Sequence, residues 1–473
     1  MGNRLNSPTK ATIWFTLGNF IAKGIAFVSL PIFTRLMDAS EYGIASLLLT
    51  YEQIILIFGT FEMYLGTYQR GIFKYKEKSD AYSGITILLM NSITVVVFLL
   101  LLINNKLLFQ YTKITMAVLI GMFARTLFQP AYECWLVRKR IAYDYKNATI
   151  SNVVLATLNV IIPILVMSCI SPTAEIRITS ALLATSVFAL CFWIVEIKKV
   201  SKANKSDIHD YLKFNMNMAL PNIPHALSFL VLANADRVMI GEMVGEKAVA
   251  YYSVAYTIGS ALMILETSIS SVFAPWMYRS IENHEEKNIS SICSKVTILL
   301  GTVVFIFVLV IPDIFNALFS EEYSNAYICI PPIALSSLFM FIYSAFVHYE
   351  LYNEKPKYIM IVSSICAIMN VILNYVCIPI AGYSICCWTT LVSYMFFALG
   401  HYIFARKISV MKGIEFPFDV RRLALISILF VMLISLGSLL YDNMILRYGI
   451  VFVIFMLIVI FRKQVISSIG AIK

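Results

Sequence analysis

Long apolar segments alternate with short polar loops along almost the whole chain, from Ala11 to Phe461. Most of the segments reach about 20 residues with few charges, the length that an α-helix needs to cross the hydrocarbon core of a bilayer. Lipid cannot satisfy free backbone groups, and the alternation typical of barrel strands is absent from these segments. The pattern therefore predicts an all-α integral membrane protein.

We predict about 14 transmembrane helices from these segments. They cover roughly residues 11–33, 43–65, 81–103, 114–137, 147–170, 178–197, 214–235, 248–275, 290–312, 326–349, 358–379, 384–405, 423–440 and 448–461. The first run is too long for a signal-peptide core and is expected to be retained. No loop looks long enough to form a separate soluble domain.

Composition agrees with this pattern. Hydrophobic residues make up 60% of the 473 residues and charged residues only 14%, whereas a soluble domain carries about 25% charged residues. The nine cysteines lie in or beside apolar segments, and their spacing indicates neither a metal site nor a disulfide framework. We expect no metal and no cofactor.

The positions of lysine and arginine predict the orientation, because these residues accumulate in cytoplasmic loops. With the N-terminus placed inside, 28 of the 37 lysines and arginines fall in cytoplasmic loops, 7 fall in outside loops and 2 lie within helices. The chain is thus predicted to be multi-pass with both termini cytoplasmic. Its net charge of +10 is explained by anionic lipid headgroups, so no nucleic-acid partner is needed.

Weak internal matches recur in the same order along the two halves of the chain. Arg35 and Arg237 end the first and seventh segments, and Asn159 and Asn370 lie in the fifth and eleventh. The order predicts two six-helix halves, residues 1–200 and 201–410, followed by two additional C-terminal helices in residues 411–473. Because six is even, the halves would share one orientation and be related by a pseudo-two-fold axis along the membrane normal, with a central site between them.

Three stretches of the sequence resemble a known family. They are residues 31–37 with Glu41-Tyr42-Gly43, residues 236–241 with 248–253, and residues 370–379 with 381–383. They resemble the polysaccharide-biosynthesis (O-antigen or repeat-unit) flippases of the multidrug/oligosaccharidyl-lipid/polysaccharide exporter superfamily. Ala250 stands where that family usually has glycine. The resemblance extends from the first to the twelfth segment and implies a MATE-like fold.

The resemblance also implies a function. It implies a flippase that moves an undecaprenyl-diphosphate-linked oligosaccharide, such as an O-antigen, lipopolysaccharide or capsule repeat unit, across the bacterial cytoplasmic (inner) membrane by alternating access. Membrane lipid and other polysaccharide-assembly proteins would be its partners. A cation-coupled multidrug exporter of the same fold is an alternative. A membrane polysaccharide polymerase is another, although such an enzyme would need a large catalytic loop. No nucleotide-binding loop is present, so we expect a transporter and not an enzyme.

Charged residues within apolar segments are candidates for function, because their insertion costs about 2.5–3.5 kcal/mol each. Lys23 and Arg125 lie near the middle of the first and fourth segments. Both suit a diphosphate, which arginine can engage through its fork and lysine as a point charge. The alternative is pairing with an intramembrane carboxylate such as Glu52. For Lys23 both interpretations remain open, and for Arg125 we favour substrate binding.

Three further residues complete the predicted site. His225 matches Lys23 at the repeat offset and follows two prolines, Pro221 and Pro224, that can break a helix. It is predicted either to contact substrate or to be a helical histidine hydrogen-bonded to a neighbour, with the prolines forming a static kink. Glu52 and Glu266 could take up a proton or bind Na+ and so couple transport to an ion gradient. The alternative is that each only neutralises a nearby cation, which we favour for Glu52 and leave open for Glu266. Four other glutamates near cytoplasmic ends, Glu62, Glu133, Glu196 and Glu350, are expected to be solvated.

Overall fold

The computed structural model describes residues 8–142 and 144–460. These residues are helical almost throughout and contain no strand. They form two compact units, Met1–Gly241 with Gly245–Ala250, and Glu242–Val244 with Tyr251–Lys473. The boundary between the units lies at residues 241–251. The predicted boundary near residue 200 concerns a sequence repeat, a different property from compactness, and it stays a prediction.

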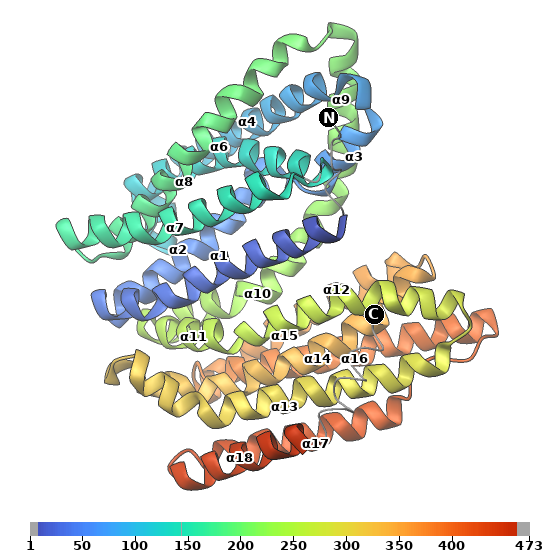
Figure 1. Cartoon of the computed structure of the whole chain (residues 1–473). Helices are drawn as coiled ribbons and strands as arrows, with labels where there is room; N and C mark the ends of the chain where they lie inside the picture. Colours follow the sequence, from blue (N-terminus) through green and yellow to red (C-terminus); the bar gives the residue numbers. More distant parts are fainter. Residues whose placement is uncertain (1–7, 143, 461–473) are drawn as a thin grey trace, which may run out of the picture. The chain divides into compact units, whose positions relative to one another are not determined.

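In the described residues, the first unit runs from α1 to α10 and includes the start of α11 (Figure 1). Its helices are α1 Pro8–Leu36, α2 Ala39–Thr60, α3 Gly66–Lys74, α4 Ser79–Ile103, α5 Asn105–Thr112, α6 Met116–Ile141, α7 Tyr145–Cys169, α8 Ala174–Ile197, α9 Lys205–Ala219, α10 Ile223–Met243 and the start of α11 Glu246–Gly259. Helix α6 packs on α8, α7 packs on both α1 and α8, and α2 packs on α4. A 3-10 turn, Leu220–Asn222, separates α9 from α10, as the prolines there predicted.

The second unit continues from α11 with seven more helices. They are α12 Ala261–Glu282, α13 Glu286–Leu318, α14 Ile330–Tyr352, α15 Pro356–Ala381, α16 Ile385–Lys412, α17 Val420–Ser438 and α18 Met444–Ile460. Helix α14 is the most central of them, since it packs on α12, α13 and α16. The two C-terminal helices, α17 and α18, both pack on α13. Arg447 of α18 donates to both carboxylate oxygens of Asp313 on α13, at 2.5 and 3.2 Å.

The predicted spans correspond to helices of the structure. Ten helices or joined helices in the described residues are long and apolar enough to cross a membrane, or 11 if the pair Asn105–Thr112 and Met116–Ile141, bent by 101°, counts as one span. The remaining predicted spans lie on α1, α10 and the shorter apolar helix α18. The all-α integral membrane fold is therefore confirmed.

The first motif of the family resemblance forms a tight corner between α1 and α2. Asp38 caps α2 by accepting a hydrogen bond from the Glu41 amide at 2.9 Å. Gly43 faces the backbone of α11, where a methyl group would overlap the Glu246 carbonyl. Arg177 of α8 lies over the Tyr42 ring, 4.7 Å from its centroid. The motif therefore has a structural role, which is to join α1, α2, α8 and α11.

Two asparagines that the repeat pairs with each other make matching contacts. Asn159 on α7 accepts a hydrogen bond from Thr185 on α8 at 2.7 Å. Asn370 on α15 donates to Ser393 on α16 at 3.1 Å. Each asparagine thus links the fifth and sixth predicted helices of its own half, as acceptor in the first and as donor in the second. The repeat itself stays a prediction.

Candidate functional site

Arg125 and Glu52 meet inside the first unit, in the middle of their helices. Arg125 Nη1 lies 3.2 Å from Glu52 Oε2, with the Glu52 side chain 3% exposed and the Arg125 side chain 22% exposed. Gly59 lets α2 approach α6 here, because a Cβ at this position would lie only 2.7 Å from Thr126 Cγ2. The close approach of the two helices brings the carboxylate within reach of the guanidinium.

Arg125 is also held by polar side chains on its own helix. Its Nε donates to Gln129 Oε1 at 2.5 Å, and the Gln129 amide reaches Glu133 Oε1 at 3.4 Å. The one-turn spacing of the three residues places them along one face of α6. Glu52 Oε1 is buried and has no hydrogen-bond partner among the described residues. The guanidinium of Arg125 is therefore orientated by a residue of its own helix. One carboxylate oxygen of Glu52, its counter-ion, has no hydrogen-bond partner among the described residues.

The structure separates the two predicted cations. Lys23 lies exposed on α1 and, among the side chains that the structure describes, makes no ion pair. The partner of Glu52 is Arg125, so pairing of Lys23 with Glu52 is not what the structure shows. His225 lies on α10, and its side chain is outside the described part of the chain. Its predicted contact with substrate stays a prediction.

Glu266 lies on α12 in the second unit and is 1% exposed. Ser344 on α14 donates to its Oε1 at 3.1 Å, and the Ser344 hydroxyl lies 2.6 Å from that of Ser270. Hydroxyls, and no cation from the described residues, thus surround this carboxylate. Among the described residues no cation lies beside Glu266, so the structure offers no partner for the simple charge neutralisation considered as one of its two roles.

Two glutamates expected to be solvated are buried, which corrects the sequence interpretation. Glu196 is 2% exposed and is bound by Ser83 at 2.7 Å and Lys199 at 2.5 Å. Glu350 is fully buried and lies 3.1 Å from His401 Nδ1. Position near a helix end did not imply solvation, because neighbouring helices cover both side chains. His401, an ionisable residue within the apolar run 384–405, was the available signal for the second pair.

No group of three or more His, Cys, Asp or Glu residues in the described part of the chain has the arrangement needed to hold a metal ion. The arrangement seen at Arg125 has a different capacity. A guanidinium fixed within a spanning helix can bind an anionic group that enters the membrane interior.

Comparisons with known proteins agree with these observations. The sequence model of the family described as polysaccharide biosynthesis protein matches residues 9–281, and that of the MatE family matches residues 221–376. No curated protein matches the chain.

Solved structures share the fold at low sequence identity. The lipid II flippase MurJ in an inward closed conformation is 13% identical, with a TM-score of 0.67 over 96% of this chain and 100% of that chain. An inward-facing multidrug resistance MATE family transporter of the MOP superfamily is 12% identical, with a TM-score of 0.65 over 83% and 96%. A MOP superfamily transporter from Pyrococcus furiosus is 14% identical, with a TM-score of 0.59 over 86% and 98%. These likenesses confirm the predicted exporter fold.

Proposed function

Since this chain belongs to the polysaccharide biosynthesis protein family, we propose that it is a flippase for a lipid-linked polysaccharide precursor. The proposed substrate is an undecaprenyl-diphosphate-linked oligosaccharide repeat unit of an O-antigen, a capsule or a related surface glycan. The proposed site of action is the bacterial cytoplasmic membrane, and the proposed mechanism is alternating access. Other proteins of polysaccharide assembly would supply and consume the substrate.

The observation that carries this proposal is the Arg125–Glu52 pair within the spanning helices α6 and α2. Charged residues within spanning helices are costly to desolvate and commonly mark a substrate or ion pathway. Arginine can bind phosphate oxygens through two parallel hydrogen bonds, so a diphosphate can replace Glu52 as its partner. Lys23, exposed on α1 and not paired with Glu52, is proposed to contact the substrate separately from Arg125.

Ion coupling follows from the same pair. When a diphosphate takes the place of Glu52 beside Arg125, a carboxylate that is only 3% exposed loses its counter-ion, and a proton is the simplest replacement. Glu266 is the equivalent candidate in the second unit, because its hydrogen-bond partners among the described residues are the hydroxyls of Ser270 and Ser344. We propose Glu52 as the primary coupling residue and Glu266 as the secondary one.

A second candidate is a cation-coupled multidrug exporter, which is favoured by the MatE match over residues 221–376. The charge of the site distinguishes the two. Arg125 would attract an anionic substrate, whereas a cationic drug would depend on the surrounding glutamates and gain from removal of the arginine. Arg125→Ala should therefore lower transport of an anionic lipid-linked substrate by a flippase and raise transport of a cationic drug by an exporter.

The test is to delete the gene and measure the lipid-linked repeat unit in each leaflet with a membrane-impermeant glycan probe on spheroplasts. We expect the unit to accumulate on the cytoplasmic face. Arg125→Ala should lower outward movement at least about tenfold, the effect of losing a charge-assisted hydrogen bond. Arg125→Lys should retain part of the activity as a point charge, and Lys23→Ala should lower it less.

Lys106→Ala, on the exposed helix α5, is a matched control that removes a cation away from the pair. Each variant is compared at equal membrane abundance. If the repeat unit reaches the outer face normally in the deletion strain and only polymer is missing, the flippase proposal is wrong and a polymerase step takes its place. If loss of the gene changes only susceptibility to cationic drugs, the exporter is correct.

A further inference from the structure

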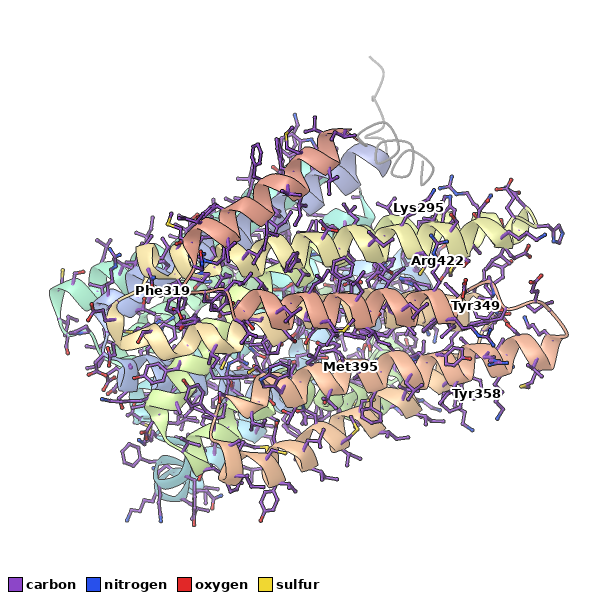
Figure 2. The ribbon with its side chains drawn as sticks, turned by 90° about the horizontal axis from the view of Figure 1, so that it is seen from below. Lys295, Phe319, Tyr349, Tyr358, Met395 and Arg422 are labelled. Atoms are coloured by element: carbon purple, nitrogen blue, oxygen red, sulfur yellow. The ribbon has the colours of Figure 1, made fainter. Side chains whose placement is uncertain are left out.

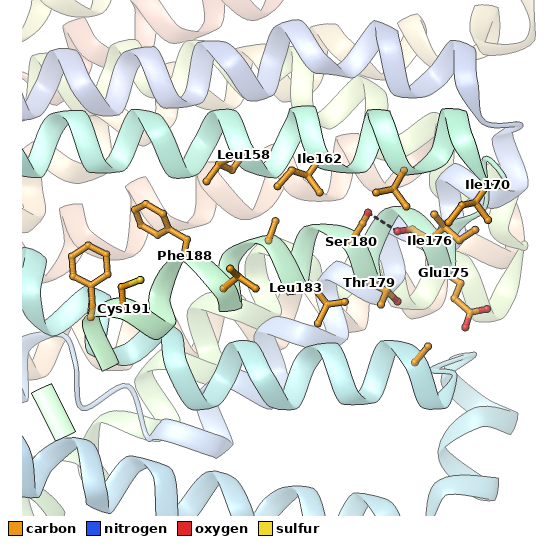
Figure 3. A pocket seen from close by; sticks show the side chains of 15 residues that line it. Leu158, Ile162, Ile170, Glu175, Ile176, Thr179, Ser180, Leu183, Phe188 and Cys191 are labelled. Atoms are coloured by element: carbon orange, nitrogen blue, oxygen red, sulfur yellow. Dashed lines mark hydrogen bonds between the residues drawn. The ribbon is translucent and has the colours of Figure 1, made fainter. Parts of the chain in front are cut away.

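A long apolar groove lies on the first unit between α7 and α8 (Figure 3). Its volume is about 880 Å³. Leu158 and Ile162 enter it from α7 and Phe188 from α8, as Figure 3 shows, and Ala117 of α6 is also part of the lining. Its lining includes neither Arg125 nor Glu52, so it is distinct from the site proposed above.

The groove occupies one face of α8, and the opposite face packs on α6. Leu182 contacts Gly121 of α6, where a Cβ would lie 3.2 Å from the leucine side chain. The residues Ile176, Leu183 and Val187 follow helical spacing on the groove side. Leu183 is 43% exposed and Val187 68% exposed. The groove is therefore open to the surroundings of a spanning helix, which in a membrane are hydrocarbon chains.

The length of the groove indicates which kind of lipid chain fits it best. Its lining on α8 extends from Glu175 to Phe192, which at 1.5 Å per residue is roughly 26 Å. The hydrocarbon core of a bilayer is about 30 Å thick, so an acyl chain anchored in one leaflet fills about half of that. A polyprenyl chain is much longer and can pass through both leaflets. A continuous groove of this length fits the longer chain.

The charge at the ends of the groove gives the occupant a direction. Glu175 lies exposed at one end, where its carboxylate accepts a hydrogen bond from Thr115 at 2.8 Å. Phe188 and Phe192 line the other end and pack with Tyr132 of α6 at ring distances of 5.3 and 5.1 Å. A phosphate beside Glu175 would be repelled. A lipid with its phosphates at the aromatic end would place only hydrocarbon near this carboxylate.

From these observations we propose that the groove between α7 and α8 binds the polyprenyl chain of a polyprenyl diphosphate whose phosphates lie at the cytoplasmic side. The inference rests on the proposed function for the identity of the lipid and on the predicted orientation, in which Glu175 is outside. The groove holds the tail while the headgroup is cytoplasmic. Repulsion at Glu175 disfavours the same lipid in the inverted orientation, so the groove favours loading from the cytoplasmic leaflet.

The test uses the full-length protein in phospholipid vesicles that contain a small fraction of polyprenyl diphosphate. A photoreactive p-benzoylphenylalanine is placed at Leu183, in the groove, or at Val195, which is 60% exposed on α8 outside it. Adducts are identified by mass spectrometry. We expect isoprenoid adducts at residue 183 at least about tenfold above those at residue 195, because a shaped apolar site concentrates its ligand above the bulk lipid. Equal yields at both positions, or acyl adducts alone at 183, would overturn the inference.

A groove-filling variant gives a second measurement. Ala184→Phe places a ring in the lining and should lower the isoprenoid adduct at residue 183 about fivefold, since it occupies volume that the chain needs. Val195→Phe adds the same ring outside the groove and should leave the yield unchanged. An undiminished adduct in correctly folded Ala184→Phe protein would count against the groove as the site.

The outcomes separate this inference from the proposed function. Arg125→Ala should lose translocation and keep the adduct at residue 183, because the headgroup contact and the tail contact are distinct. If translocation is intact and no enrichment occurs at residue 183, the groove inference fails alone. If enrichment occurs and deletion of the gene leaves the repeat unit normally distributed, the flippase proposal fails and the lipid site stands.

Discussion

Arg125 and Glu52 illustrate how a single ion pair governs a membrane-embedded site. Glu52 is almost completely buried, and one of its oxygens has no partner among the described residues. The pair balances the desolvation of both charges, and removal of one partner leaves the other uncompensated. Gln129 of α6 also accepts a hydrogen bond from the guanidinium. Under the proposed function, Arg125 and Glu52 therefore affect both stability and the binding of an anionic ligand.

A double-mutant cycle tests this dependence. Arg125→Ala should lower the free energy of unfolding by roughly 3 kcal/mol, because Glu52 remains buried without a cation. Adding Glu52→Gln should recover much of that loss, since a neutral amide has no charge to desolvate. Thermal unfolding of the purified variants in detergent measures both changes.

The cycle also has a clear opposing result. If the losses from Arg125→Ala and Glu52→Gln simply add in the double variant, the two residues are energetically independent. The ion pair would then be a feature of geometry without a coupling role, and the proposal of Glu52 as the proton acceptor would lose its basis.

At the scale of helices and corners, close backbone approaches hold the first unit together. Gly43 of α2 lies against the Glu246 carbonyl of α11, and Gly59 of α2 lies against Thr126 of α6. The residues around Gly43 are also those that carry the family resemblance. Their structure shows that this motif maintains a helix corner, so it predicts the fold and carries little information on substrate.

Gly43→Ala should reduce stability by about 1–3 kcal/mol, because the new methyl group overlaps backbone that cannot move aside as a side chain could. Gly24→Ala on α1 is the matched control, since a Cβ there meets nothing within 4 Å. It should be neutral or stabilising by roughly 0.5–1 kcal/mol, as alanine favours a helix interior. Thermal unfolding and membrane abundance measure both. Equal tolerance of the two substitutions would contradict the close approach of α2 and α11.

At the scale of the whole molecule, the positions of two basic residues in the second unit can be compared with the predicted membrane orientation. Figure 2 shows Lys295, Arg422 and Tyr349 towards one end of this unit, with Phe319 towards the other and Met395 between them. The predicted orientation places both Lys295 and Arg422 on the cytoplasmic side. These two residues lie towards the same end of the unit, which is consistent with that prediction.

Epitope tags inserted in the full chain test the orientation. A tag between Ala203 and Asn204, after α8, should be protected in intact spheroplasts and become reactive only after permeabilisation. A tag between Ser171 and Pro172, before α8, should react from outside. The physical reason is the excess of lysine and arginine on the cytoplasmic side. The reverse pattern would show that the N-terminus is outside and would also invert the direction proposed for the lipid groove.

Much of the candidate site could be anticipated from single residues. Arg125 and Glu52 stood out because charge within an apolar run is rare, and the structure brings these two together. Their pairing could not be read from the chain, since Lys23 was an equally suitable partner for Glu52 and only helix packing separates the candidates. Glu350 and His401 were not recognised as a pair, because burial of a helix end depends on the helices around it.

The sequence by itself determined that this protein is a multi-pass helical membrane protein, where its spans lie and which family it belongs to. Those properties depend on local hydrophobicity and on motifs, which are continuous along the chain. The tertiary structure alone decided which charges meet, which carboxylates are buried and that α7 and α8 enclose a long groove. These depend on contacts between residues far apart in the chain, and helix packing sets such contacts through side-chain shape and close approach.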